Sequence, residues 1–226
     1  MIKGLLFDLD NTLIDFLKMK NKCCEKSVSA MIESGLPLKK DKALEILYEI
    51  YEKYGIEHQK IFQEFLKETI GKIDYKLLAK GIIAYRRVKN SMLTTFPHVV
   101  STLKKLKKNS FKLGVVSDAP KLQVWLRLAE LEIIDFFDVV VALKEEGEEK
   151  PSKVPFLRAA KKLNLKPEEI IFVGENPERD IFGAKSVGMK TAFALYGITY
   201  RKPPQKIDSD YILKDFSDLL KILGIK

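Results

Sequence analysis

Two aspartates near the N-terminus form the first pattern with chemical potential. An apolar run at residues 2–8 ends at Asp8, and Asp10, Asn11 and Thr12 follow it closely. In an extended chain, residues two apart point to the same side, so Asp8 and Asp10 would share one side. Carboxylates so placed repel each other unless a cation or a donor accompanies them. The pair therefore indicates a hard cation with oxygen ligands, Mg²⁺ being the usual case beside phosphate. Taken alone, the segment is also typical of a polar turn after a strand.

Three further polar segments share one feature, because each follows another apolar run. They are Ser117 and Asp118 after 112–116, Lys150 after 137–143, and Glu175 with Asp180 after 169–173. The carboxyl ends of parallel strands lie at one edge of a sheet, so we expect these side chains to converge there. Separately, each has a plainer interpretation as a helix cap or a surface charge. Together and in this order, they favour a single catalytic site.

The elements that must position these residues are short apolar strands that alternate with amphipathic helices. Such runs are typical of strands buried on both faces of a parallel sheet. The predicted strands are 2–8, 112–116, 137–143, 169–173, 190–194 and 210–213. The predicted helices between them are 97–108, 120–131, 153–164, 177–187 and 215–223. This alternation predicts an α/β fold with a doubly wound parallel sheet.

One stretch interrupts the alternation, because residues 16–92 contain no convincing strand. Amphipathic helical patterns cover 19–34, 41–54, 57–70 and 74–90. We therefore predict an α/β core domain formed by residues 1–15 and 93–226, with a helical-bundle cap domain inserted at 16–92. The insertion leaves the core beside Asp8 and Asp10, where a lid would exclude water from a reaction.

Composition narrows the classes of protein. The 226 residues are 46% hydrophobic and 31% charged, which supports a folded core rather than disorder. The formal net charge is +9, but the lysines lie mostly on helical patterns as solvated faces, and no nucleic-acid-binding signature appears. No apolar run reaches the roughly 18–20 residues of a membrane span, and no signal-peptide pattern is present. Cys23 and Cys24 are adjacent, which fits neither a disulfide framework nor a zinc site. We expect a cytoplasmic protein without nucleic-acid or membrane partners.

Over nearly its full length, the sequence resembles the haloacid dehalogenase-like hydrolases. The residues that carry the resemblance are Asp8-Leu9-Asp10-Asn11-Thr12, Ser117, Lys150, and Glu175 with Asp180, which look like the four motifs of that family in order. The insertion resembles the helical cap of the subgroup related to phosphoglycolate phosphatase. Two flanking segments, Glu146-Gly147 and 180–185, are also similar to that subgroup.

The resemblance implies a phosphatase that transfers phosphate to Asp8 and then to water. Asp10 would protonate the leaving oxygen and later take a proton from water, held in place by Thr12. Ser117 would bind a phosphate oxygen, and Lys150 would offset the charge gathered at Asp8. Expected substrate contacts are Thr12, Ser117, Asp118 and Lys150. Expected metal ligands are Asp8, the backbone carbonyl of Asp10, and Glu175, with Asp180 acting through water or Lys150.

The implied cofactor is Mg²⁺, and the implied partner is a small phosphorylated metabolite such as phosphoglycolate, a triose phosphate or another sugar phosphate. One departure concerns the metal, because the fourth motif usually begins Gly-Asp and here begins Gly174-Glu175. Dehalogenases of this kind generally lack the second aspartate, so Asp10 favours phosphate chemistry. A phosphomutase stays open as an alternative, as does a non-catalytic binding protein of this fold, which only Glu175 and the basic charge favour.

Overall fold

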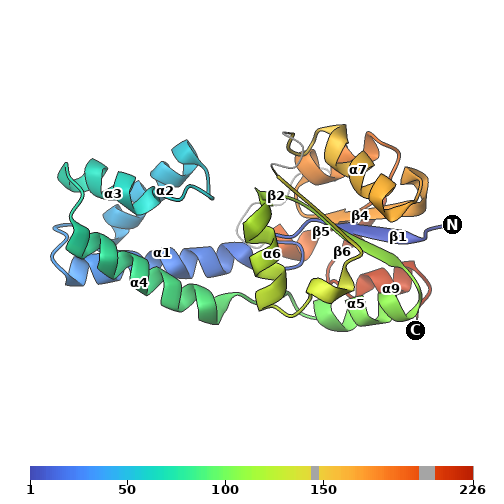
Figure 1. The fold of residues 1–226 in the computed structure, drawn as a ribbon, viewed down its shortest axis with the longest axis horizontal. Coiled ribbons are helices and arrows are strands. Elements are labelled where there is room, and N and C mark those ends of the chain that lie inside the picture. The colour runs from blue at the N-terminus through green and yellow to red at the C-terminus, as the bar shows by residue number, and fades with distance from the viewer. Residues whose placement is uncertain (144–147, 199–206, 226) are drawn as a thin grey trace. The chain divides into compact units, whose positions relative to one another are not determined.

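A six-stranded parallel sheet forms the centre of the larger part of the protein (Figure 1). The computed structural model describes residues 1–143, 148–198 and 207–225. The strand order is β3-β2-β1-β4-β5-β6, and each described pair is parallel. The strands are β1 (Gly4–Phe7), β2 (Lys112–Pro120), β3 (Val139–Leu143), β4 (Ile170–Gly174), β5 (Lys190–Ala194) and β6 (Tyr211–Leu213). This order confirms the predicted doubly wound parallel sheet.

The central strand β1 lies at the point where the strand order reverses. Phe7 is in register with Val115 of β2 on one side and with Val173 of β4 on the other. The backbone N–H of Asp8 donates to the carbonyl of Val173 at 2.9 Å, so Asp8 lies beside the last residues of β4. All residues of β1 and β4 are buried, as expected for strands covered on both faces. Ligands of open α/β sheets bind at this kind of switch point.

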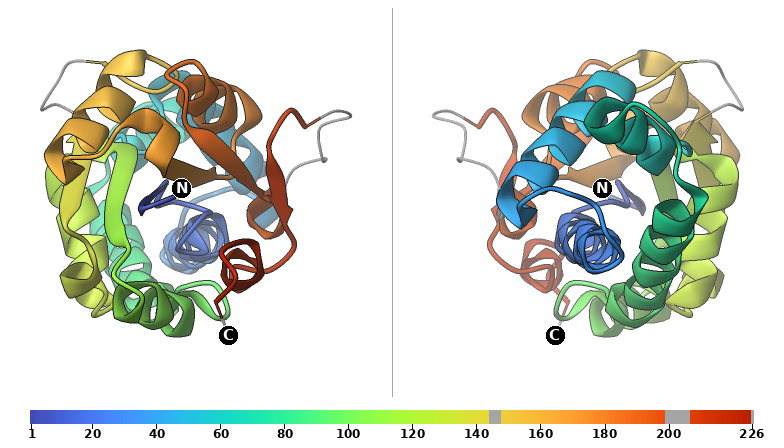
Figure 2. Two further views of the ribbon diagram at one scale, coloured as in Figure 1. Left: turned by 90° about the vertical axis from the view of Figure 1, so that its right-hand side faces the viewer. Right: turned by 90° about the vertical axis from the view of Figure 1, so that its left-hand side faces the viewer.

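Helices cover both faces of the sheet. The helices of this part are α5 (Val99–Lys108), α6 (Lys121–Glu130), α7 (Lys153–Leu163), α8 (Gly183–Lys185) and α9 (Asp218–Ile222). Helix α7 lies on one face and α5 with α9 on the other, as Figure 1 and the end-on view of Figure 2 show. Phe156 of α7 packs edge-to-face on Phe172 of β4, with ring centroids 4.9 Å apart. On the opposite face, Phe7 packs against Phe216 at 5.6 Å.

The helix predicted at 177–187 is present over residues 177–185, but its first part is π-helical. Residues Pro177–Phe182 form a π-helical turn, and only Gly183–Lys185 are α-helical. The N–H groups of Asp180 and Ile181 both donate to the carbonyl of Asn176, at 3.0 and 3.2 Å, which widens the turn. The Asn176 side chain also caps the turn by accepting from the N–H groups of Glu178 and Arg179. Such π-turns are frequent at functional sites.

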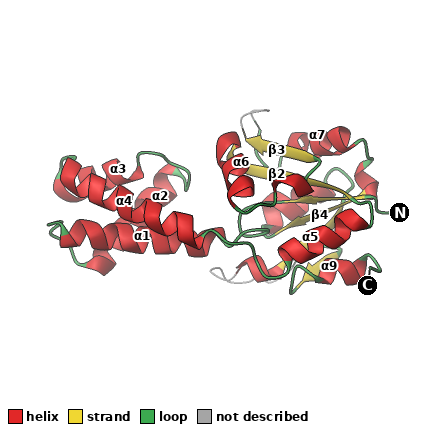
Figure 3. Cartoon of the chain, turned by 60° about the horizontal axis from the view of Figure 1, so that its bottom comes forward, coloured by secondary structure: helices red, strands yellow, loops and turns green. Residues whose placement is uncertain are grey.

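Residues 16–93 form a second compact unit made of four helices joined by loops (Figure 3). They are α1 (Phe16–Glu33), α2 (Lys40–Tyr54), α3 (Ile61–Ile70) and α4 (Tyr75–Met92). The other unit comprises residues 1–15 and 94–226. Helices α1 and α4 approach closely at Gly81, whose carbonyl accepts from the Ser27 hydroxyl at 3.0 Å. A Cβ at Gly81 would overlap the terminal methyl group of Met31, so a larger residue there would require the Met31 side chain to move. Whether this unit serves as a cap stays a prediction.

The helical unit has its own hydrophobic core. It contains, among other buried side chains, Val28 and Met31 of α1, Leu47 of α2, and Phe65 and Leu66 of α3. Each of these is fully buried. Among the described residues, no helix combines the length and the apolar character needed to cross a membrane.

We expect Phe65→Ala to lower the free energy of unfolding by about 3–5 kcal/mol, because it leaves a cavity in this core. The matched control is Ile83→Ala, since Ile83 lies in the same unit and is 45% exposed. Urea denaturation followed by circular dichroism measures both. Equal losses for the two variants would show that Phe65 is not a core residue.

Candidate active site

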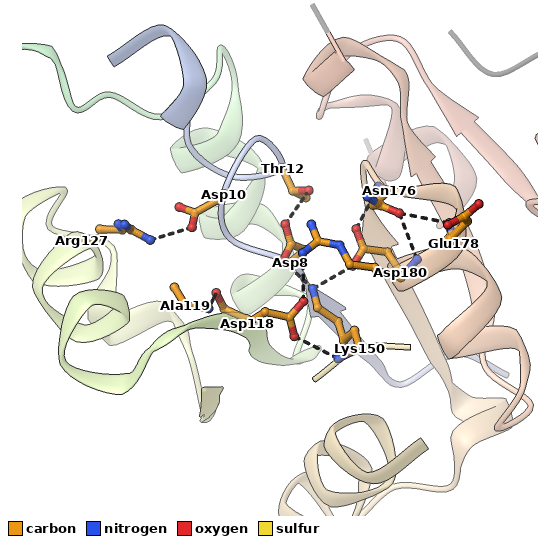
Figure 4. Close-up of polar contacts among 12 residues, drawn as sticks. Asp8, Asp10, Thr12, Asp118, Ala119, Arg127, Lys150, Asn176, Glu178 and Asp180 are labelled. Atoms are coloured by element: carbon orange, nitrogen blue, oxygen red, sulfur yellow. Dashed lines mark hydrogen bonds and ion pairs between the residues drawn. The ribbon is translucent and has the colours of Figure 1, made fainter. Parts of the chain in front are cut away.

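Three side chains from separate segments meet at the end of the central strands. The Nζ of Lys150 lies 2.6 Å from an oxygen of Asp8, which follows β1. The same Nζ lies 2.7 Å from an oxygen of Asp180, in the π-helical turn after β4. Figure 4 shows Asp8 and Asp180 converging on Lys150. The sequence-predicted convergence of these three residues is therefore present in the structure.

Lys150 is a buried cation between two acids. Its side chain and that of Asp180 are fully buried, and that of Asp8 is 8% exposed. Burial alone would lower the pKa of Lys150, but Asp180 and Asp8 raise it above its usual value, so the amine is charged. Burial alone would raise the pKa of Asp180, but Lys150 and the N–H of Asn176 hold it below its usual value. These two residues form a firm ion pair.

The segment after β4 is shaped to bring Asp180 over the strand end. Asp180 accepts from the N–H of Asn176 at 2.9 Å and is fully buried. A Cβ at Gly174 would lie 2.5 Å from the Cβ of Asp180. The close approach of these two residues therefore requires glycine at position 174, the first residue of the fourth motif.

Glu175 completes an acidic cluster that fits a metal ion. Ligand oxygens of Asp8, Glu175 and Asp180 lie within 4.8 Å of one another, and all three residues are buried. Oε2 of Glu175 is buried and has no hydrogen-bond partner within the described parts of the chain. A buried carboxylate oxygen is costly without a partner. Three carboxyl groups beside one lysine also leave an excess of negative charge, which a divalent cation would balance.

The pKa values of two of these acids reflect that excess. Burial, aided by Asp180, raises the pKa of Asp8 to about 7 even though Lys150 opposes the change. Burial, together with Asp180 and Asp8, raises the pKa of Glu175 to about 9. A bound cation favours the charged form of a ligand and reverses this effect. Ionisation of all three carboxyl groups is therefore unfavourable in this site, and a bound metal ion would offset that cost.

The loop after Asp8 is held rigidly. Asn11 has a left-handed backbone with a φ of 62°, and its N–H donates to the carbonyl of Ile14 at 2.7 Å. The Tyr196 hydroxyl donates to the carbonyl of Thr12 at 2.8 Å. The next residue, Gly197, lies so close to Asn11 that a Cβ would overlap its carbonyl. Segments far apart in the sequence thus fix the backbone that carries the first motif.

Thr12 takes a different partner from the one expected. Its hydroxyl donates to Oδ2 of Asp8 at 3.3 Å, and the residue is fully buried. The loop turns after β1, so Thr12 folds back over Asp8 rather than toward Asp10. The hydroxyl therefore supports Asp8, and the expected contact of Thr12 with substrate stays a prediction.

Asp10 lies apart from the acidic cluster. Its Oδ2 lies 2.6 Å from Nη1 of Arg127, a residue of α6 whose side chain is 4% exposed. In Figure 4, Asp10 is directed toward Arg127, while Asp8 is directed toward Lys150. The two aspartates thus have separate cationic partners, and the carboxylate of Asp10 is not in the acidic cluster. The metal contact expected of Asp10 is through its backbone carbonyl.

Ser117 and Asp118 lie where β2 loses its regular pairing with β3, between Ser117 and Pro120. Ser117 is 5% exposed, and its Oγ accepts from the N–H of Ala119 at 3.2 Å. Asp118, expected to bind substrate, instead accepts from the backbone N–H of Lys150 at 3.0 Å. Its other oxygen pairs with Arg179 at 3.3 Å. Asp118 therefore positions the segment that carries Lys150.

Sequence analysis missed three residues of this site: Arg127, Arg179 and Tyr196. A signal for Arg127 was present, because it shares the apolar stripe of α6 with Val124 and Leu128. A charged residue on the buried face of a helix needs a buried partner. No comparable signal marked Tyr196. Of the two similar flanking segments, Glu146-Gly147 lie outside the described residues.

Comparisons with known proteins agree with this geometry. A family model described as haloacid dehalogenase-like hydrolase matches residues 5–194. A glyceraldehyde 3-phosphate phosphatase of Methanocaldococcus jannaschii is 36% identical over 223 residues, covering 99% of this chain and 97% of that protein. A pyrophosphatase of Halalkalibacterium halodurans is 30% identical over 229 residues, covering 100% and 98%. The crystal structure of a HAD phosphatase from Thermococcus onnurineus matches with a TM-score of 0.72 and 27% identity, covering 99% and 98%.

The raised pKa values predict an unusual dependence of stability on pH. A carboxyl whose folded pKa is raised contributes stability that is present below its unfolded pKa and is lost as pH rises through the folded pKa. The stability contributed by Asp8 is lost as the pH rises to about 7, and that contributed by Glu175 is lost as the pH rises to about 9. In chelator, we therefore expect the free energy of unfolding to fall between pH 5 and pH 9, and a divalent cation to restore it.

Urea denaturation at several pH values, with chelator or with Mg²⁺, measures this effect. Glu175→Gln is the matched variant, because it removes one of the two titrating groups and should make the fall with pH shallower. Stability in chelator that stayed constant or rose over this range would contradict the charge excess.

Proposed function

The chain belongs to the haloacid dehalogenase-like hydrolase family, and we propose that it acts on a small phosphate monoester through a phosphorylated Asp8. It is a phosphatase, as are its curated relatives. The observation that carries the proposal is the buried contact of Lys150 with both Asp8 and Asp180. That contact holds one carboxylate at a fixed place beside a cation, as a nucleophile requires.

In the first step, an oxygen of Asp8 attacks phosphorus, and the bond from phosphorus to the leaving oxygen breaks. Asp10 gives the leaving oxygen its proton. In the second step, water attacks the phosphorus of phospho-Asp8, and Asp10 takes the proton of that water. The bond between Asp8 and phosphorus then breaks and releases inorganic phosphate. Asp8 cannot supply the proton itself, because its oxygen is the nucleophile.

Other residues stabilise the charge of the transferring group. Lys150 offsets negative charge as Asp8 and the phosphate come together, since its Nζ already lies 2.6 Å from Asp8. The Ser117 hydroxyl accepts from Ala119 and so keeps its own proton for a phosphate oxygen. Thr12 donates to the Asp8 oxygen opposite the one that Lys150 contacts, which limits rotation of the carboxylate.

The metal ion of this site is proposed to be Mg²⁺. Asp8, Glu175 and the backbone carbonyl of Asp10 would hold it, with Asp180 acting through water or through Lys150. Bound there, Mg²⁺ supplies positive charge that favours phosphoryl transfer. The long side chain of Glu175 fits this role because one of its oxygens is buried and has no hydrogen-bond partner among the described residues.

The proposed substrate is a triose phosphate. Support comes from several relatives that are named glyceraldehyde 3-phosphate phosphatases, of which three match over 98% or more of this chain. We further propose that residues 16–93 act as the cap that selects the substrate. The chain enters that unit at Phe16, directly after the loop that carries Asp8 and Asp10.

We expect Asp8→Asn to abolish phosphatase activity, because the amide is a poor nucleophile of nearly the same shape. Phosphate release from glyceraldehyde 3-phosphate and from p-nitrophenyl phosphate measures it, with Mg²⁺ or with chelator. Asp135→Asn is the control, since Asp135 is exposed on the same unit. Activity that survived in Asp8→Asn would falsify the nucleophile assignment. Inorganic pyrophosphate belongs in the same screen, and its clear preference over glyceraldehyde 3-phosphate would overturn the proposed substrate.

Glu175→Gln should weaken Mg²⁺ binding by roughly 10–100-fold or more, because even outer partners of metal ligands contribute that much. Isothermal titration of the protein with Mg²⁺ measures the affinity without reference to turnover. Glu178→Gln is the matched control, because Glu178 is exposed three positions along the same segment. Unchanged affinity in Glu175→Gln would exclude Glu175 as a ligand.

A further inference from the structure

Arg127 is a buried cation whose described contact is with the second aspartate of the first motif. Its Nη1 lies 2.6 Å from Oδ2 of Asp10, and its side chain is 4% exposed. A buried guanidinium has a large desolvation cost unless it is paired. It comes from α6, on the helix face that also buries Val124 and Leu128. Arg127 is thus a buried, paired cation rather than an ordinary surface charge.

The backbone of Asp10 is already fixed, so the main freedom of this residue lies in its side chain. Asp10 and Ile14 form a β-bridge, and the N–H of Asn11 donates to Ile14 at 2.7 Å. Arg127 restricts the remaining torsions by a short charge-assisted hydrogen bond. The side chain of Asp10 is 22% exposed as a whole, while its Oδ1 is buried.

The two aspartates are held by different kinds of cation. Lys150 presents a single ammonium to Asp8 and also to Asp180, as a point charge within the acidic cluster. Arg127 presents a planar guanidinium, which specifies direction as well as charge. A carboxylate that must exchange a proton with a water or a leaving oxygen needs correct direction more than added charge.

We propose that Arg127 is a positioning residue that orients Asp10 for proton transfer during hydrolysis of phospho-Asp8. This inference rests on the proposed function above. In that step, the water oxygen bonds to phosphorus, the water proton passes to Asp10, and the bond between phosphorus and Asp8 breaks. In this role, Arg127 acts through Asp10 and not directly on the phosphate or the water. It holds the carboxylate that receives the proton.

The orientation matters differently in the two steps when p-nitrophenyl phosphate is the substrate. Its leaving group is a stabilised phenolate that departs without a proton, so formation of phospho-Asp8 needs little from Asp10. Hydrolysis of phospho-Asp8 still needs a base. Loss of Arg127 should therefore slow the second step selectively, and phospho-Asp8 should accumulate.

The experiment is rapid mixing of full-length protein, Mg²⁺ and p-nitrophenyl phosphate, with wild type, Arg127→Met and Arg127→Lys. We expect Arg127→Met to release a burst of p-nitrophenol whose amplitude approaches one molar equivalent per active site. Slow steady-state turnover should follow the burst. Its kcat should fall toward that of Asp10→Asn, whose loss should be on the order of 10²–10⁴-fold. Arg127→Lys keeps the charge without the planar fork and should recover only part of the rate. Arg158→Met, on α7, is the control and should behave as wild type.

A purely structural role predicts another pattern. Arg127→Met would then lose activity only in proportion to folded protein, measured by circular dichroism, and would show no burst. Arg127→Lys, the milder change, provides the same reading if Arg127→Met does not fold. A double variant with Asp10→Asn tests the coupling, because Arg127→Met should cost nothing further once Asp10 is gone. A full additional loss would overturn the proposal.

The outcomes separate this inference from the proposed function. Persistent activity in Asp8→Asn, or absence of a phosphorylated protein in every variant, would remove the proposed function itself. A burst in Asp10→Asn together with none in either Arg127 variant would leave that function intact and reject only the positioning role of Arg127.

Discussion

The buried ammonium of Lys150 between Asp8 and Asp180 is the contact on which the rest of the site depends. Isolated charges at this depth would be very costly, and the three together offset much of that cost. Surrounding features act to keep the contact in place. Asp118 accepts from the backbone of Lys150, Asn176 donates to Asp180, and Gly174 leaves room for it. The result is one anchored carboxylate at the end of the central strand.

The single positive charge of Lys150 does not balance the acids of the site, and this excess of negative charge favours binding of a cation. Glu175 adds a third carboxyl group with a buried oxygen that lacks a hydrogen-bond partner among the described residues. The protein accepts this unfavourable arrangement because a divalent cation and a phosphate group together complete it. The raised pKa values of Asp8 and Glu175 are the expression of the same excess. The acidic cluster therefore lowers the stability of the folded protein while it provides a site for a cation.

The parallel sheet explains why residues so distant in sequence can form such a contact. Strands β1, β3 and β4, which precede Asp8, Lys150 and Asp180, run parallel in one sheet, so the segments that follow them leave at one edge. At that edge, each of the two aspartates of the first motif pairs with a different cation. Asp8 is turned to Lys150 in the acidic cluster, and Asp10 is turned to Arg127 of α6. A nucleophile and a proton carrier can thus lie two residues apart without sharing an environment.

The amino-acid sequence alone determined the strands, their parallel class and the residues that end them, because buried parallel strands leave continuous apolar runs and their ends collect polar groups. Tertiary structure decided which partner each polar residue meets. Thr12 supports Asp8, Asp118 positions Lys150, and Asp10 pairs with Arg127. It also made the first part of the helix expected at 177–187 π-helical, after Asn176. Asp10 and Arg127 are 117 residues apart, and Asp118 and Lys150 are 32 apart. The Thr12 contact and the π-helical start depend on local hydrogen bonds. Periodicity in a sequence records neither kind of contact.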